Sequence, residues 1–180
     1  MFGKMKLSLH FSLPLIAGMA LTACETTSEQ TRISEAQPAA TVFLVRHAEK
    51  TMEKNDPALT TQGRQRADLL ADTLQDAGIT RIYSSDYIRT RDTAAPLAKH
   101  LGLTVKLYDA GNLDAIAETL KMEGGRTLVV GHSNTTPQLV ELLGGEGGEP
   151  IVEATEYNRL YIVTRSKNGE VGTTLLQFGD

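Results

Sequence analysis

Two short apolar runs in this chain each lead into a histidine. Residues 41–45 (TVFLV) are followed directly by Arg46 and His47, and residues 126–130 (RTLVV) are followed, after one glycine, by His132. If the two runs are neighbouring parallel strands, both imidazoles lie at the same carboxyl edge of a sheet, where open α/β sheets bind ligands. One such histidine is commonly structural, but two of them, each at the tip of an apolar strand, are harder to explain in that way and are candidates for a functional site.

The elements that must position these histidines alternate between strand and helix. Further strands are expected over residues 81–84 and 103–108, and helices over 60–77, 86–101, 113–122 and 136–143, with Gly78 and Gly102 ending the first two helices. Residues 158–164 and 171–177 are expected to form two strands joined by the turn at Asn168-Gly169. The sequence therefore predicts an α/β three-layer sandwich, in which helices flank a mostly parallel sheet with an antiparallel C-terminal hairpin.

Four short motifs follow one another along this pattern. They are residues 45–49 (VRHAE), 59–63 (LTTQG), 84–94 (SSDYIRTRDTA) and 129–133 (VVGHS). Together they resemble the signature of the histidine phosphatase superfamily, which includes phosphoglycerate mutases and acid phosphatases. The resemblance extends over the chain from about residue 41 onward. The short length is similar to that of the compact phosphohistidine phosphatases rather than the longer mutases.

The resemblance implies a phosphate pocket made of Arg46, His47, Arg89 and His132. In that family the residue at the position of His47 is the nucleophile, which becomes a phosphohistidine, and the one at His132 donates to a phosphate oxygen. Fixed cations suit this chemistry because they stabilise the charge on a phosphoryl group in transfer. Arg91 is expected to point away from Arg89 on a helix. No cluster with metal-ligand spacing occurs, so we expect neither a metal nor a cofactor.

The proton donor for the leaving group is harder to assign. Family members place a carboxylate after the third strand or beside the second histidine, but here Ser133-Asn134 follows His132. Asp109 follows the predicted strand 103–108 and is the best-placed carboxylate. An equally open interpretation is that Asp109 forms a turn in the sequence Asp-Ala-Gly-Asn. Weak acid catalysis favours a phosphoramidate or an activated phosphate as substrate.

The sequence thus predicts a metal-independent phosphatase acting on a phosphomonoester or a phosphoramidate through a phosphohistidine on His47. Its partner would be a phosphorylated small molecule or a phosphohistidine protein. One alternative is a phosphoglycerate-type mutase, although the short connections favour a pocket open to water. Another is a protein that binds phosphate ligands without turnover, although binding alone needs no nucleophile.

The N-terminus resembles the export signal of a bacterial lipoprotein. Lys4 and Lys6 precede a mostly apolar stretch, and residues 21–24 (LTAC) resemble the lipobox, in which the cysteine is lipidated. We therefore expect a signal peptide over 1–23, a lipid on Cys24, a polar tether over 24–40 and a catalytic domain over 41–180. The lipid would hold the domain at the periplasmic face of the cell envelope. The outer membrane is favoured in a two-membrane bacterium, because Glu25 replaces the retention aspartate.

Composition excludes several other classes. The chain has 180 residues and a formal charge of −4, with 41% hydrophobic residues, so it can bury the core of one domain. No run of Lys or Arg exceeds two residues, which argues against nucleic acid as a partner. The single cysteine cannot form an intrachain disulfide. We expect a monomer that meets the membrane through its lipid.

Overall fold

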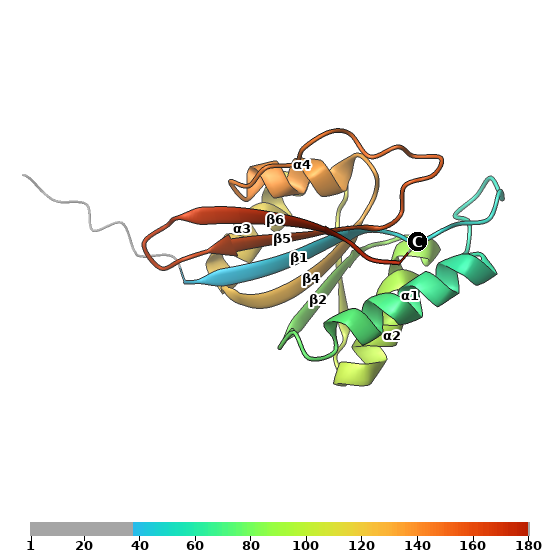
Figure 1. Cartoon of the computed structure of the whole chain (residues 1–180), viewed down its shortest axis with the longest axis horizontal. Helices are drawn as coiled ribbons and strands as arrows, with labels where there is room; N and C mark the ends of the chain where they lie inside the picture. The colour runs from blue at the N-terminus through green and yellow to red at the C-terminus, as the bar shows by residue number, and fades with distance from the viewer. Residues whose placement is uncertain (1–37, 180) are drawn as a thin grey trace, which may run out of the picture. The chain divides into compact units, whose positions relative to one another are not determined.

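The computed structural model describes residues 38–179, which form one six-stranded sheet with helices on both faces (Figure 1). The strands are β1 (Ala40–Arg46), β2 (Arg81–Ser85), β3 (Val105–Tyr108), β4 (Gly125–Gly131), β5 (Arg159–Arg165) and β6 (Val171–Gln177). The helices are α1 (Thr61–Leu74), α2 (Ile88–Leu101), α3 (Leu113–Glu123) and α4 (Thr135–Leu142).

The sheet is mixed, with strand order β3-β2-β4-β1-β5-β6. The first four strands in this order are parallel, whereas β5 runs antiparallel to β1 and β6 antiparallel to β5. The β5–β6 connection contains Gly169 with a φ of 88°, a left-handed conformation that suits glycine. The predicted α/β sandwich with an antiparallel C-terminal pair is thereby confirmed.

Alternation along β1 explains why the sheet has a core on each face. Val42 and Leu44 pack with residues of α3 and α4, whereas Phe43 and Val45 pack with residues of α1 and α2. Side chains of a strand point alternately to the two faces, so a strand covered on both sides is apolar throughout. The buried run 42–45 therefore belongs to a central strand that packs against both helix layers.

Two predicted helix boundaries were wrong by more than one residue. Helix α1 ends at Leu74 with Gln75 as its C-cap, and Gly78, with a φ of 69°, lies in the connection that leads into β2. Helix α2 begins at Ile88 rather than Asp86, because the chain turns at Ser85–Tyr87 before the helix starts. Gly102 ends α2 as predicted, in the left-handed conformation, and donates its backbone N–H to carbonyls of the last turn.

Strand β1 begins at Ala40, one residue before the expected domain start, because Ala40 is paired with both Gly125 and Arg165. The described chain thus begins at Pro38, at the amino end of β1 and at the opposite edge of the sheet from Arg46. The predicted signal peptide, Cys24 and most of the predicted tether lie outside the described residues. Within residues 38–179, no helix is both long and apolar enough to cross a bilayer.

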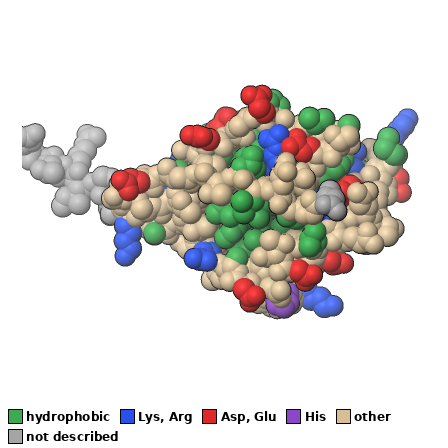
Figure 2. Space-filling view, viewed as in Figure 1, with side chains coloured by type: hydrophobic (Ala, Val, Ile, Leu, Met, Phe, Trp, Pro, Cys, Tyr) green, Lys and Arg blue, Asp and Glu red, His purple; other side chains and the backbone are tan. Residues whose placement is uncertain are grey.

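The outer strand β6 differs from β1 in leaving most of its side chains in solvent. Figure 2 shows hydrophobic side chains gathered near the centre of the viewed face, and the exposed large ones of the molecule include Leu175 and Leu176 of β6 and Leu69 of α1. The buried, chemistry-bearing residues lie instead where β1 and β4 end.

Candidate active site

Parallel pairing of β1 and β4 brings the two histidines together, as the sequence pattern predicts. Arg46 is paired with Gly131 in the register, and the backbone N–H of His47 donates to the Gly131 carbonyl at 2.9 Å. The imidazole centroids of His47 and His132 lie 5.5 Å apart. Both rings line a cavity of about 350 Å³ whose other chemically active lining residues are Tyr87, Arg89, Ser133 and Glu153.

His47 is held in one tautomer. Its Nδ1 lies 2.7 Å from the carbonyl oxygen of Ala48, which can accept a hydrogen bond but cannot donate one. The Nδ1 atom therefore carries the proton, and Nε2 keeps its lone pair. Burial, aided by the nearby positive charges of Arg46 and Arg89, lowers the pKa of His47 to about 3. His47 is thus a neutral imidazole with a free nucleophilic nitrogen at neutral pH.

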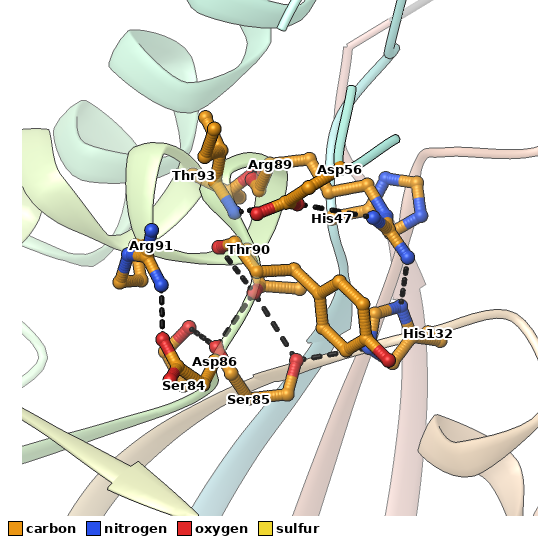
Figure 3. A network of polar contacts seen from close by, with 12 residues as sticks. His47, Asp56, Ser84, Ser85, Asp86, Arg89, Thr90, Arg91, Thr93 and His132 are labelled. Carbon is orange, nitrogen blue, oxygen red and sulfur yellow. Dashed lines mark hydrogen bonds and ion pairs between the residues drawn. The ribbon is translucent and has the colours of Figure 1, made fainter. Parts of the chain in front are cut away.

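His132 is fixed by a chain of hydroxyl groups from β2 and α2. Ser85 Oγ lies 2.9 Å from His132 Nε2 and donates to Thr90 Oγ1 at 3.1 Å, and Thr90 Oγ1 donates in turn to the Ser85 carbonyl at 2.8 Å (Figure 3). Because the Ser85 hydroxyl proton is used in the bond to Thr90, Ser85 Oγ accepts from His132, and Nε2 of His132 is therefore the donor. Nδ1 then accepts from Arg89 Nη2 at 3.4 Å. Burial and the charge of Arg89 lower the pKa of His132 to about 4.

Arg89 extends from the first turn of α2 towards His132 (Figure 3). Its Nη1 lies 3.6 Å from Asp56 Oδ1, and its guanidinium carbon lies 4.3 Å from the centroid of the Tyr87 ring. Its Nε is a buried donor without a hydrogen-bond partner among the described residues. Arg91 points away from His132 and pairs with Asp86, which confirms the expected separation of the two arginines.

Arg46 lies beside this cavity rather than in its lining. Its guanidinium carbon is 4.0 Å from the centroid of the Tyr157 ring, and Nη1 donates to the Glu156 carbonyl at 2.9 Å. Nη2 is 3.8 Å from Glu153 Oε1, and both Nε and Nη2 are buried without a hydrogen-bond partner among residues 38–179. Burial lowers the pKa of Arg46. The side chain therefore keeps unused donors close to His47.

Asp109 does not line the cavity that holds His47. Its carboxylate is exposed and accepts from the Gly111 backbone N–H at 2.8 Å, so it makes the turn that was the open alternative for this residue. It lies in an adjoining cavity of about 460 Å³ that shares Tyr87, Ala110 and Gly111 with the first.

Two site residues were missed by sequence reasoning, Glu153 and Tyr157. Both belong to the segment between α4 and β5, and Glu153 Oε2 accepts from Ser133 Oγ at 2.8 Å. The Ser133 hydrogen bond and the charge of Arg46 hold the pKa of Glu153 below its usual range. Because β5 runs antiparallel to β1, with Leu160 opposite Val45, the residues before β5 must return to the edge where β1 ends. That pairing was the signal that could have located them.

The remaining motif residues build the scaffold of the site. A Cβ on Gly63 would lie 2.2 Å from the Glu49 carbonyl oxygen, so the first turn of α1 can approach the loop after β1 only with glycine there. Thr93 Oγ1 accepts from the Ala48 backbone N–H at 3.0 Å and donates to the Arg89 carbonyl at 2.7 Å. These contacts fix the backbone that follows His47.

Metal ligation finds no support in this part of the chain. Among residues 38–179, no three His, Cys, Asp or Glu side chains are grouped closely enough to hold a metal ion. The donors that surround the cavity are cations and hydroxyl groups, which suit an anionic ligand instead.

Comparison with known proteins supports the class that the motifs indicate. Residues 42–110 match the model of the histidine phosphatase superfamily, branch 1. This stretch contains the first three motifs and ends before His132. The chain is also 38% identical over 73 residues to the probable phosphoglycerate mutase GpmB of Erwinia tasmaniensis, a match over 37% of this chain and 34% of that protein. Its match to the protein of the same name from Escherichia coli O1:K1 / APEC is 33% over 95 residues, 43% of this chain and 44% of that one. The chain therefore spans less than half of the length of these curated relatives.

Solved structures share the fold over nearly their whole length. The protein histidine phosphatase SixA complexed with tungstate is 22% identical, with a TM-score of 0.61 over 76% of this chain and 96% of that one. The phosphoglycerate mutase of Bacillus anthracis str. Sterne is 15% identical, with a TM-score of 0.60 over 81% and 95%. A mycobacterial glucosyl-3-phosphoglycerate phosphatase is 16% identical, with a TM-score of 0.55 over 77% and 98%. At these identities the likeness shows the fold alone. Together with the family match, it supports the histidine phosphatase superfamily, whose members are phosphatases or mutases.

Proposed function

We propose that this chain is a metal-independent phosphatase that hydrolyses a phosphomonoester or a phosphoramidate through a phosphohistidine on His47. The observation that carries the proposal is the tautomer of His47. Its Nδ1 proton is committed to the Ala48 carbonyl, so the lone pair of Nε2 is free beside Arg89 and His132 in a cavity of about 350 Å³. A buried neutral imidazole of this kind is suited to nucleophilic attack at neutral pH.

The reaction has two displacements at phosphorus. First, Nε2 of His47 forms a bond to phosphorus while the bond to the leaving group breaks with its electron pair. Water then attacks the phosphohistidine, the N–P bond breaks, and inorganic phosphate leaves with the lone pair restored to Nε2. The buried donors of Arg46 and Arg89 would bind the phosphoryl oxygens, which carry the developing charge.

His132 would take up a proton when the phosphoryl group binds. In the free site its Nδ1 accepts from Arg89, so it must gain a proton to donate to a phosphoryl oxygen. A bound dianion favours the charged imidazole and supplies the reason for that uptake.

The first test compares His47→Ala with His100→Ala in the full chain. His100 lies exposed on α2 and is the matched control. With p-nitrophenyl phosphate and with phosphoramidate, in the presence of EDTA, we expect His47→Ala to lose turnover and His100→Ala to keep it. An acid-labile phosphoryl adduct, detected by mass spectrometry on His47 after rapid quenching, would accompany turnover. Undiminished hydrolysis by His47→Ala would contradict the mechanism.

A mutase is the second candidate, favoured by the names of the curated relatives. Product analysis with a phosphoglycerate separates the two functions. Release of inorganic phosphate supports the hydrolase, whereas conversion to the isomeric phosphoester supports the mutase. A protein that binds phosphate in calorimetry but turns over neither substrate would be the non-catalytic alternative.

We also propose that Cys24 carries a lipid and that the domain works in the cell envelope. The support is the order of Lys4 and Lys6, an apolar stretch and LTAC in the sequence. Mass spectrometry of the mature N-terminus tests this: we expect a start at a lipidated Cys24, and an unmodified Cys24 would refute the proposal.

A further inference from the structure

We propose that Glu153, held by Ser133, is the proton donor to the leaving group. This inference rests on the phosphatase function proposed above. Of the described residues that line the cavity around His47 and His132, Glu153 alone carries a carboxyl group. Its side chain is 70% exposed, so a substrate can reach it.

Glu153 is aimed by a single directed hydrogen bond. The Ser133 hydroxyl donates to Oε2 at 2.8 Å, while Oε1 lies 3.8 Å from Arg46 Nη2, beyond hydrogen-bond distance. The carboxyl group is therefore fixed beside the residue that directly follows His132, yet Oε1 remains free to carry a proton. A carboxylate neutralised by a close arginine could not serve in this way.

Other carboxylates near the site are already engaged in structural contacts. Asp56 Oδ1 accepts from the backbone N–H of Ile88 at 2.9 Å, where it supports the start of α2. Asp109 makes its turn with Gly111 in the neighbouring cavity. Glu156 accepts from Arg159 and from the backbone N–H of Val152. Glu153 differs from these three because its hydrogen bond comes from one hydroxyl group, and its ion-pair contact with Arg46, at 3.8 Å, is longer than a hydrogen bond.

Glu153 can donate the proton that the leaving group needs and can regain it in the second step. When the P–O bond breaks, the leaving oxygen takes both the electron pair and the proton of the Glu153 carboxyl group. The resulting carboxylate then accepts a proton from the water that attacks the phosphohistidine, which restores the carboxyl form that Glu153 has in the substrate complex. No other acid or base is required.

The free site holds Glu153 as a carboxylate, since its pKa lies below the usual range. Binding of a phosphoryl group changes this balance, because the substrate charge offsets the arginines and opposes the nearby carboxylate. A phosphomonoester that binds as a monoanion also brings the required proton with it. The carboxyl group is thus protonated in the complex although it is ionised in the free protein.

The experiment uses the dependence of rate on the leaving group, which a merely structural residue would not alter. An alkyl phosphate such as glycerol phosphate releases an alkoxide and needs a proton, whereas p-nitrophenyl phosphate releases a stable phenolate. For Glu153→Gln in the full chain, we expect kcat/KM on the alkyl phosphate to fall by about 10²–10⁴-fold. On p-nitrophenyl phosphate we expect a loss of less than about tenfold, with His47 still phosphorylated.

Two further variants complete the test. Glu153→Asp keeps a carboxyl group and is expected to recover part of the alkyl phosphate activity at an unchanged melting temperature. Asp109→Asn is the matched comparison and is expected to leave the ratio of the two rates unchanged. Equal losses on both substrates in Glu153→Gln, or a selective loss in Asp109→Asn instead, would overturn the assignment. So would a wild-type protein that turns over p-nitrophenyl phosphate through His47 but not alkyl phosphates, and that result would leave the proposed phosphatase function intact.

Discussion

Arg66 on the one hand, and Arg46 and Arg89 on the other, have different contacts with carboxylates. Arg66 of α1 forms a closed ion pair with Glu49: its Nε lies 2.8 and 3.1 Å from the two carboxylate oxygens, and its Nη2 lies 2.8 Å from Oε1. Arg89 and Arg46 have carboxylates only at 3.6 and 3.8 Å. All three side chains are largely buried, so burial alone does not separate the two groups.

The difference lies in what each guanidinium has left to offer. The Glu49–Arg66 pair is bidentate, which is the geometry that compensates for removing both charges from water. Arg89 and Arg46 are instead supported by aromatic rings and single contacts, and they retain buried N–H groups without a partner among the described residues. Such unsaturated cations, whose buried N–H groups lack hydrogen-bond partners, lower the stability of the fold, and they are suited to binding a charged ligand. The comparison therefore separates a structural arginine from two that serve the proposed chemistry.

The largest expected effect is the contrast between removing the charge of Arg89 in the candidate site and removing that of Arg66 in the structural ion pair. Arg89→Gln should lower kcat/KM on p-nitrophenyl phosphate by about 10²–10³-fold, because a donor aimed at the phosphoryl oxygens is lost. Its melting temperature should change little. Arg66→Gln should instead destabilise the fold by about 3–5 kcal/mol, because Glu49 is left buried and unpaired. That loss corresponds to a fall of about 2–4 °C in melting temperature per kcal/mol. The specific activity of the folded protein should persist.

Arg91→Gln is the matched control for this prediction. Arg91 lies two residues from Arg89 on the same helix, but its side chain is 40% exposed and pairs with an exposed Asp86. Exposed pairs contribute about 0–1 kcal/mol, so neither activity nor melting temperature should change measurably. If Arg91→Gln lost activity as Arg89→Gln does, the distinction between unsaturated and paired arginines would fail.

Much of the fold could be predicted because local signals agree with the tertiary structure. Residues 42–45 of β1 and 127–130 of β4 are buried, so both strands could be predicted without knowledge of their partners. Parallel pairing then places the residues after each run at one edge, which located His47 and His132. Gly78 led to the wrong helix end because a glycine in the left-handed conformation commonly caps a helix, whereas α1 ends at Leu74 with Gln75 as its cap.

The surroundings of Arg46 could not be predicted in the same way. Glu153 and Tyr157 lie in a segment without periodicity, and they reach the site because β5 is antiparallel to β1. Strand order is a long-range property that no local pattern carries. For Asp109 the position after β3 was predicted correctly. Its side chain, however, accepts from the Gly111 backbone and does not line the cavity around His47. The sequence thus located His47 and His132, which follow strand ends closely. It missed Glu153 and Tyr157, which reach the site only because β5 pairs with β1.

A smaller effect, which sharpens the same comparison, is the pH dependence of stability. The folded-state pKa values of about 3 for His47 and about 4 for His132 lie below the ordinary value of 6.5. At pH values between the folded-state pKa and the ordinary pKa, the unfolded chain binds more protons than the folded one. The free energy of unfolding must therefore fall as the pH decreases from 6.5 towards 4. The unsaturated arginines contribute, because their charge opposes protonation of both imidazoles. We therefore expect the melting temperature to fall by several degrees over this window.

The histidine contribution can be isolated from that of the carboxylates by comparing variants. The double variant His47→Gln/His132→Gln should show a shallower fall in melting temperature than the wild type, whereas His100→Gln, on the exposed face of α2, should keep the wild-type slope. Sulfate, which stays dianionic throughout, should stabilise the wild type more at pH 5 than at pH 7, because an anion among these cations favours protonated imidazoles. The same sulfate effect in the double variant would show that the anion binds away from His47 and His132. An identical pH slope in all three proteins would show that the two imidazoles are not held neutral by their surroundings.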